Sequence, residues 1–419
     1  MGRDQLLQQL NAPKAKKRLK AVKKLQKLDV KLGAEFLPQV RENDANLHIH
    51  TFYSYSPYSP SQAAYLAYRS GLASAGIMDH DTLSGAEEFV KACKTLGIAH
   101  SVGFDFRVRL KQDKNAQYPL HTDGYTYVAV YGVPKKVLKK VNLWLQEDRE
   151  MRRARNHKFC ESVSRLFAPH GVTLDYAKDV FPLTKIKEDG SVTERHVLRA
   201  AATNVVATYG KGEGVTTFLQ KVGFTVDDHL SALLSDQDNP FYLDDLVTAL
   251  KENAGAFGVG SRREAIDMPD VVTRLENFGA IVSYLYFGNL DELVSGADAN
   301  EKVQNLVLGI KELGFHSISV KVSRLAEEDL SLLCEACRQH EILLLLGTAV
   351  NSPRQPFGCD VQLKPEFKSL ADACWAVVGY GKMSDCNLED GMFSEKALKR
   401  QPSLMDRVTL YAEIGRKTC

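Results

Sequence analysis

The sequence lacks the features that mark several classes of protein. Its 54 lysines and arginines nearly balance its 52 aspartates and glutamates, so the 419 residues carry a net charge of only +2. This balance excludes the strong overall field of a nucleic-acid coat protein. No apolar run approaches the roughly 18 residues that a membrane span needs, and the N-terminus has no apolar segment typical of a signal peptide. We therefore expect a cytoplasmic protein without a membrane partner, and we do not expect nucleic acid as its partner.

Patterned cysteines and nucleotide-binding glycines are also missing. The eight cysteines are scattered over the chain, which argues against a disulfide scaffold and predicts reduced thiols. Cys334 and Cys337 form a C-x-x-C motif, but their segment has the pattern of an amphipathic helix and no second pair stands at zinc spacing. We interpret them as ordinary helix thiols. No glycine-rich phosphate loop follows a strand.

The first forty residues have a helical pattern. Apolar residues recur at helix spacing between lysines and arginines, namely Leu19, Val22, Leu25, Leu28 and Leu32. We favour a solvated helix that packs on the body through this stripe. The alternative is a helix that binds a phosphate backbone or a membrane surface.

Short apolar segments alternate with helical ones from about residue 44, which predicts a parallel sheet or barrel. The alternation stops after Pro134, where a charged and mostly helical block begins, and resumes near residue 276. We therefore predict an α/β barrel split by a helical insertion. The predicted parts are a basic helical segment over 1–43, the first part of the barrel over 44–134, the insertion over 135–275, the second part of the barrel over 276–395 and a C-terminal helix over 396–419.

Candidate metal ligands stand at the ends of three consecutive predicted strands. His48 and His50 are two residues apart on one strand, so their side chains share a face and can hold one metal ion. An H-x-H motif alone is weak evidence, because two such histidines are more often ordinary surface or core residues. His80 ends the next predicted strand and Asp105 the one after. The carboxyl ends of barrel strands share one rim, so these four side chains are predicted to converge.

These segments resemble the PHP family, the polymerase-and-histidinol-phosphatase type of metal-dependent phosphoesterases. The matching text is NLHIHTFYSYSPYSP, GIMDHDTLSGAEEF, GIAHSVGFDF and, later, SVTERHVLRA. The resemblance implies a distorted seven-stranded, TIM-like (βα)7 barrel with a helical insertion. It also implies that His48 and His50 hold a first metal, that Asp105 bridges it to a second, that His196 completes the second site and that His80 belongs to a third.

The chain departs from the family pattern at four positions. Tyr55 stands where the family has an aspartate, and Tyr127 stands where a histidine usually begins the fourth strand, unless His121 replaces it. Ala349 and Asn351 stand where the final motif has an aspartate and a histidine. The resemblance therefore implies one or two divalent ions per chain, of manganese, zinc or iron, rather than three.

The implied activity is hydrolysis of a small phosphorylated metabolite, a sugar or nucleoside phosphate, by a metal-bound hydroxide, with His80 and Asp105 as catalytic residues. Phosphate also needs hydrogen-bond donors. The candidates for substrate binding are Arg195, Arg324, Asn351 and Arg354, of which Arg354 is preferred because its loop follows a late predicted strand.

Two further interpretations concern residues around this rim. Asp79 and Asp81 are predicted to orient His80, and the basic stretch over 152–155 is interpreted as a solvated helix face.

The alternative function is a degenerate barrel that binds a metal or a phosphorylated ligand without catalysis, or an interaction scaffold. The oligomeric state is left open.

Overall fold

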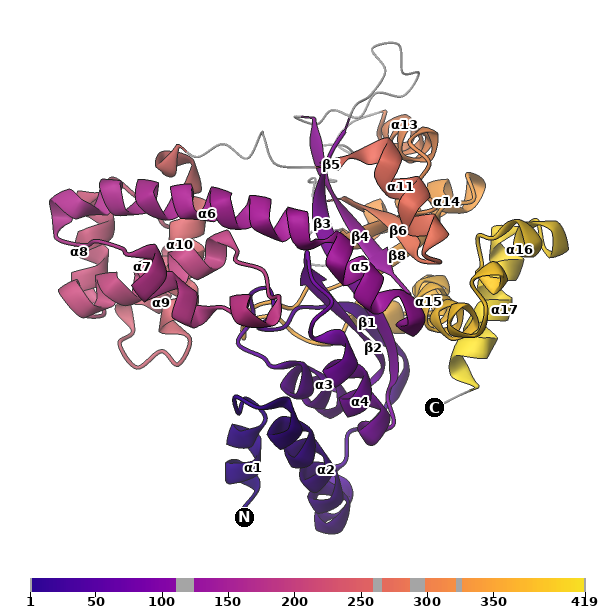
Figure 1. Ribbon diagram of the computed structural model, residues 1–419, viewed down its shortest axis with the longest axis horizontal. Coiled ribbons are helices and arrows are strands. Elements are labelled where there is room, and N and C mark those ends of the chain that lie inside the picture. Colours follow the sequence, from indigo (N-terminus) through magenta and orange to yellow (C-terminus); the bar gives the residue numbers. More distant parts are fainter. Residues whose placement is uncertain (1, 111–123, 259–265, 287–297, 322–325, 418–419) are drawn as a thin grey trace.

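The computed structural model describes residues 2–110, 124–258, 266–286, 298–321 and 326–417. Its centre is a sheet in which seven strands follow one another around a nearly closed barrel, in the order β1-β2-β3-β4-β6-β7-β8 (Figure 1). The strands are β1 Arg41–Ile49, β2 Leu72–His80, β3 Ala99–Arg109, β4 Tyr125–Tyr131, β6 Ile281–Tyr286, β7 Ser317–Lys321 and β8 Leu343–Gly347, and the short β5, Ile266–Asp267, pairs with β3. The predicted seven-stranded barrel is confirmed.

The sheet is not wholly parallel, in contrast to the expectation from the strand and helix alternation. Strand β4 pairs antiparallel with both β3 and β6, whereas the other neighbouring strands of the barrel are parallel. A parallel neighbour requires a crossover, usually a helix. No amphipathic helix pattern stands between β3 and β4 in the sequence, which fits the reversal.

Helices cover the barrel on its outside and close one of its ends. The outer helices are α3 Pro60–Arg69, α4 Ala86–Leu96, α5 Leu138–Trp144, α11 Met268–Asn277, α13 Ala299–Glu312 and α14 Glu327–Gln339. A separate apolar cluster joins inward residues of the strands, such as Met78 and Tyr131, to Trp375 of α15, Lys368–Cys386, and to Tyr411 of α17, Leu404–Arg416. Because apolar side chains fill that part of the barrel, polar chemistry is left to the opposite rim.

The insertion has a hydrophobic core of its own. The long helix α6, Gln146–Phe167, leads from the barrel to the helices at the left of Figure 1. These are α7 Glu194–Tyr209, α8 Glu213–Lys221, α9 Asp228–Ser235 and α10 Tyr242–Glu252. The Phe167 ring packs edge-on against the rings of Phe218 and Phe257 at the centre of this second core. The domain boundaries given above stay predictions.

The N-terminal segment packs on the barrel helices. It contains α1, Arg3–Gln9, and α2, Ala15–Leu32, which lie beside α3 and α4 (Figure 1). Val22 and Leu25 of the predicted stripe are fully buried, while Leu32 at the helix end is exposed. Arg18 is buried as well, and its guanidinium forms a two-pronged ion pair with Glu88 of α4. The segment is therefore a packed part of the body.

Two further predictions about helices concern α14 and the C-terminal residues. Cys334 and Cys337 lie on α14 as free thiols, and Cys337 is buried. The predicted C-terminal helix forms two pieces, α16, Glu395–Arg400, and α17. None of the helices in these ranges combines the length and the hydropathy of a bilayer span.

Candidate metal centre

The end of β1 places two imidazoles at the polar rim of the barrel. His48 lies in β1 and His50 directly follows it, and both are buried. A backbone bridge fixes this segment, because the His50 amide donates to the Val350 carbonyl at 2.9 Å and the Val350 amide donates to the His48 carbonyl at 3.0 Å. Gly347 leaves the room for His48, since a Cβ at that position would lie 2.9 Å from the His48 Cβ.

Asp105 brings a carboxylate to the same place. On β3, Phe104 and Phe106 belong to the outer core, so Asp105 between them faces the opposite side of the sheet. Its Oδ2 lies 3.7 Å from the His48 Nε2, and its Oδ1 is hydrogen-bonded to the Nδ1 of His80, its register partner on β2. Ligand atoms of His48, His50 and Asp105 all lie within 4.8 Å of one another.

The protonation states of this cluster suit a divalent cation. Burial lowers the pKa of His48 and lowers that of His50 well below its usual value, so both rings are neutral at pH 7. Burial alone would raise the pKa of Asp105, but the charge of His80 and hydrogen bonds with His48 and His80 bring it well below its usual value. Neutral imidazole and charged carboxylate are the metal-binding forms of these groups. Two histidines and one carboxylate are a recognised set for zinc, manganese or iron.

His196 lies near this cluster but outside it. It is the third residue of α7, and its Nδ1 accepts a hydrogen bond from the Thr193 amide at 3.0 Å, so that nitrogen caps the helix. Burial and the charge of His80 lower the pKa of His196 to about 3. The Tyr55 ring packs edge-on against the imidazole, 5.1 Å between centroids. Tyr55 therefore covers His196 where the family pattern has an aspartate.

The loop after β8 provides one unsatisfied oxygen. Asn351 is buried beside the bridge to β1, and its Oδ1 has no hydrogen-bond partner among the described residues. A buried carbonyl oxygen without a partner costs free energy unless a cation or a donor meets it. A cation bound beside Asn351 would satisfy this oxygen. His121 lies outside the described residues.

Asp79 and Asp81, which flank His80 in the sequence, contact residues other than His80. Asp79 accepts hydrogen bonds from the amide and hydroxyl of Thr51, both at 2.6 Å, and from the Ser54 hydroxyl at 2.7 Å. It thus fixes the loop that follows His50. Asp81 forms an ion pair with Arg152. The prediction that these two carboxylates orient His80 is wrong, because Asp105 itself binds the Nδ1 of His80.

The two predicted phosphate arginines that the structure describes contact other side chains of the protein. Arg354, the preferred one, donates through Nε and Nη2 to the Asp245 carboxylate of α10, at 3.0 and 2.7 Å, and through Nη2 to Asn239. It joins the loop after β8 to the insertion, so its proposed contact with phosphate does not fit. The Arg195 guanidinium lies over the Tyr55 ring, 5.7 Å from its centroid. Arg324 lies outside the described residues.

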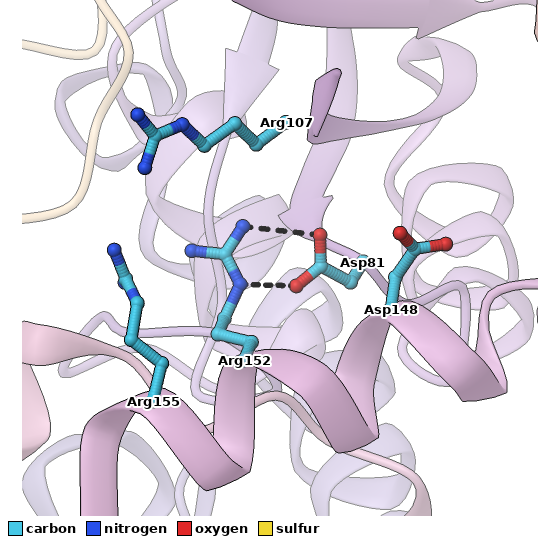
Figure 2. Close-up of a pocket in the computed structure, with 5 residues that line it drawn as sticks. All are labelled: Asp81, Arg107, Asp148, Arg152 and Arg155. Carbon is cyan, nitrogen blue, oxygen red and sulfur yellow. Dashed lines mark hydrogen bonds and ion pairs between the residues drawn. The ribbon is translucent and has the colours of Figure 1, made fainter. Parts of the chain in front are cut away.

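A group of arginines that sequence reasoning missed lies beside the cluster. Figure 2 shows Arg107 of β3 and Arg152 and Arg155 of α6 around a pocket that Asp81 and Asp148 also line. The interpretation of 152–155 as a solvated face is wrong for Arg155, which is only 8% exposed, and for Arg152, whose side chain is 10% exposed. The spacing of 148, 152 and 155 puts these residues on one face of a helix, a signal that was present in the sequence.

An α/β barrel with two histidines and a carboxylate on one rim has the architecture of a metal-dependent hydrolase. The chain belongs to the PHP domain family, which matches residues 46–258. No curated protein shows significant sequence similarity to the chain.

Two solved structures are similar to this one over 78% of the chain. An amidohydrolase from Chromobacterium violaceum, with bound sulfate and no metal, has 15% identity and a TM-score of 0.50, covering 78% of this chain and 96% of its own. A protein provisionally assigned as a metal-dependent phosphoesterase from Bifidobacterium adolescentis has 14% identity and a TM-score of 0.46, with the same coverage.

Proposed function

We propose that the protein is a metal-dependent phosphoesterase that hydrolyses a small phosphorylated metabolite, such as a sugar or nucleoside phosphate. The observation that carries this proposal is the convergence of His48, His50 and Asp105 within one ligand sphere. Membership of the PHP domain family supports it. One ion would be held by these three residues, and Asp105 is the side chain that could be shared with a second.

A divalent ion in such a site lowers the pKa of water and neutralises charge on a phosphoryl oxygen. The side chains of this protein have supporting tasks. Asp105 keeps the His80 imidazole oriented through its Nδ1, so Nε2 is the ring nitrogen that remains to contact phosphate or the leaving group. Asp79 keeps the loop after His50 in place through Thr51 and Ser54.

A second candidate is a barrel that binds a metal or a phosphorylated ligand without hydrolysis. The packing of Tyr55 on His196 favours it, because an aromatic ring there takes the room of a ligand. Ala349, which has no ligand atom in its side chain, favours it as well. The two candidates share the first metal site and differ in turnover.

The deciding experiment is elemental analysis of the purified protein together with a phosphatase screen in added manganese or zinc. His50→Ala removes a ligand, and His229→Ala, on the exposed face of α9, is the matched control. We expect about one bound ion and hydrolysis in wild type and in the control, and loss of both in His50→Ala. Bound metal without turnover would favour the second candidate. Less than a tenth of an equivalent of metal and no hydrolysis would contradict the phosphoesterase and would leave, of the second candidate, only the binding of a phosphorylated ligand.

A further inference from the structure

We propose that Arg107, Arg152 and Arg155 form a subsite for an oxyanion group, which Asp148 also lines. The inference rests on the proposed function only for the identity of the natural ligand, an anionic group of a phosphorylated substrate. Binding of an oxyanion by the pocket can be measured without any turnover.

The pocket borders the candidate metal centre on two sides. Arg107 stands two residues after Asp105 on β3, so the two side chains share a face and their Cα atoms are about 7 Å apart along the strand. Asp81 directly follows His80, and its amide donates to the Asp105 carbonyl at 2.9 Å. Helix α6 covers the pocket with Arg152 and Arg155 (Figure 2). A substrate held at the metal ligands therefore has these guanidinium groups beside it.

The pocket carries more positive charge than its carboxylates neutralise. Asp81 accepts both prongs of the Arg152 guanidinium, and Glu194 lies 2.9 Å from the Nη1 of Arg155. Arg107 has no carboxylate within ion-pair distance in the part of the chain that the structure describes, and its guanidinium lies over the Tyr125 ring. Burial lowers the pKa of Arg107, and the charges of Arg155 and Arg152 lower it further. Three partly buried guanidinium groups repel one another, and a bound oxyanion would reduce this repulsion.

Asp148 gives independent support for a ligand in the pocket. It is 7% exposed, and its buried Oδ2 has no hydrogen-bond partner among the described residues. Burial and the charge of Asp81 raise its pKa to about 8, although Arg152 and Arg149 act in the opposite direction. At pH 7 the group is therefore a neutral acid, which adds an O–H donor and no negative charge to the pocket. An ionised Asp148 would repel an anion there.

In the described part of the chain, several other charged and titratable groups surround Asp148. On its own helix they are Glu147, Arg149, Arg152 and Arg155; from the strands and the loop after β2 they are Arg107 and Asp81; and Tyr127 of β4 acts on Arg107 and Arg152. Asp148→Asn keeps the size of the side chain and a hydrogen-bond donor but cannot titrate. A pH effect that this variant loses therefore comes from the titration of Asp148 and not from these neighbours.

The first test is sulfate binding by isothermal titration calorimetry on the full, metal-loaded protein. Sulfate stays a dianion throughout the neutral and alkaline range, so a change of affinity with pH comes from the protein. We expect Arg107→Met to weaken sulfate binding about tenfold to hundredfold, the size of one charged hydrogen bond. Arg400→Met, in the exposed α16, is the matched control and should bind as wild type does. No sulfate binding, or equal affinity in Arg107→Met, would overturn the proposal.

The second test is the pH dependence of the same affinity. Wild type should lose about thirtyfold in sulfate affinity as the pH rises above about 8, the effect of one added negative charge on a dianion about 4 Å away through water. Asp148→Asn should bind sulfate at pH 7 and show no such loss. An equal loss in Asp148→Asn would assign the titration to another group and overturn the role of Asp148.

Kinetics distinguish two sources of the bound oxyanion. If the pocket holds the ester phosphate itself, Arg107→Met should lower kcat/KM even for phenyl phosphate. If it holds a second anionic group of the substrate, Arg107→Met should lower kcat/KM only for substrates with two such groups. Both results support the subsite. Sulfate binding that depends on Arg107 in a protein without any phosphatase activity would retain the subsite and contradict the proposed function alone.

Discussion

The Oδ2 of Asp105 lies 3.7 Å from the Nε2 of His48, across β2 from one strand of the barrel to another. Replacing this carboxylate by an amide removes the negative charge that a cation needs and keeps the shape. We expect Asp105→Asn to weaken metal binding by about 100-fold or more, since even indirect partners of metal ligands contribute about 10- to 100-fold. Metal titration with a competing chelator measures this change. Asp238→Asn, in an exposed loop, should bind metal as wild type does, and equal affinity in Asp105→Asn would contradict the metal site.

The final family motif can be restored by two substitutions. Ala349 has a positive φ of 49°, a conformation that aspartate adopts more readily than alanine. Asn351 carries the unpartnered buried Oδ1. We expect Ala349→Asp together with Asn351→His to raise the bound metal by about one equivalent, as measured by elemental analysis. Unchanged metal content in a folded double variant would show that the rim no longer has the geometry for a further ion.

The contact between Arg354 and Asp245 has a structural role. Arg354→Met leaves the buried Asp245 carboxylate without its two-pronged partner, which should cost about 1–3 kcal/mol in the free energy of unfolding. Urea denaturation measures this loss. The KM for a phosphorylated substrate should stay the same, and a large rise in KM without a loss of stability would instead return Arg354 to the substrate site.

The N-terminal segment should depend on one buried ion pair. Arg18 and Glu88 are both nearly inaccessible, so Arg18→Met leaves a buried carboxylate unpaired and should cost about 3–5 kcal/mol. Lys24→Met, on the exposed side of the same helix, is the control and should unfold at nearly the wild-type urea concentration. Equal midpoints for the two variants would mean that α2 contributes little to the cooperative unit.

Asp148 should make the stability of the protein fall with rising pH. Its pKa is raised to about 8 in the folded protein, against about 3.9 in an unfolded chain, so the folded state binds more protons between those values. The free energy of unfolding therefore decreases as the pH rises through this window. Asp148→Asn lacks this decrease. Its free energy of unfolding, relative to that of wild type, should therefore grow from about pH 4 to about pH 8 and then level off. Urea unfolding at several pH values tests this, and a gain that does not depend on pH would contradict the raised pKa.

The motifs near strand ends could be predicted because their geometry is local. The H-x-H spacing puts His48 and His50 on one strand face whatever the rest of the chain does. His80 ends β2 as predicted, whereas Asp105 lies inside β3, which continues for four more residues to Arg109. Once a barrel was inferred, their convergence followed from the shared rim. The correct prediction for this cluster thus needed only short-range patterns and one assumption about topology.

Residues of the insertion could not be assigned in the same way. Helical spacing shows that Asp148, Arg152 and Arg155 share a face, but not what the face meets. Figure 2 shows that this face meets Asp81, more than sixty residues earlier in the chain. Arginine is usually exposed, so whether an arginine is buried depends on its partner. The partner of Arg152 is Asp81, which lies on a different element.

By itself, then, the sequence determined the barrel class, the split around a helical block and the three residues of the candidate metal centre, because periodicity and spacing act within a few residues. Only the tertiary structure decided that Arg354 is bound by Asp245, that Tyr55 covers His196 and that Arg107 meets two arginines of α6. These relationships join residues far apart in the chain. Their energies come from burial and charge, which depend on which elements pack together.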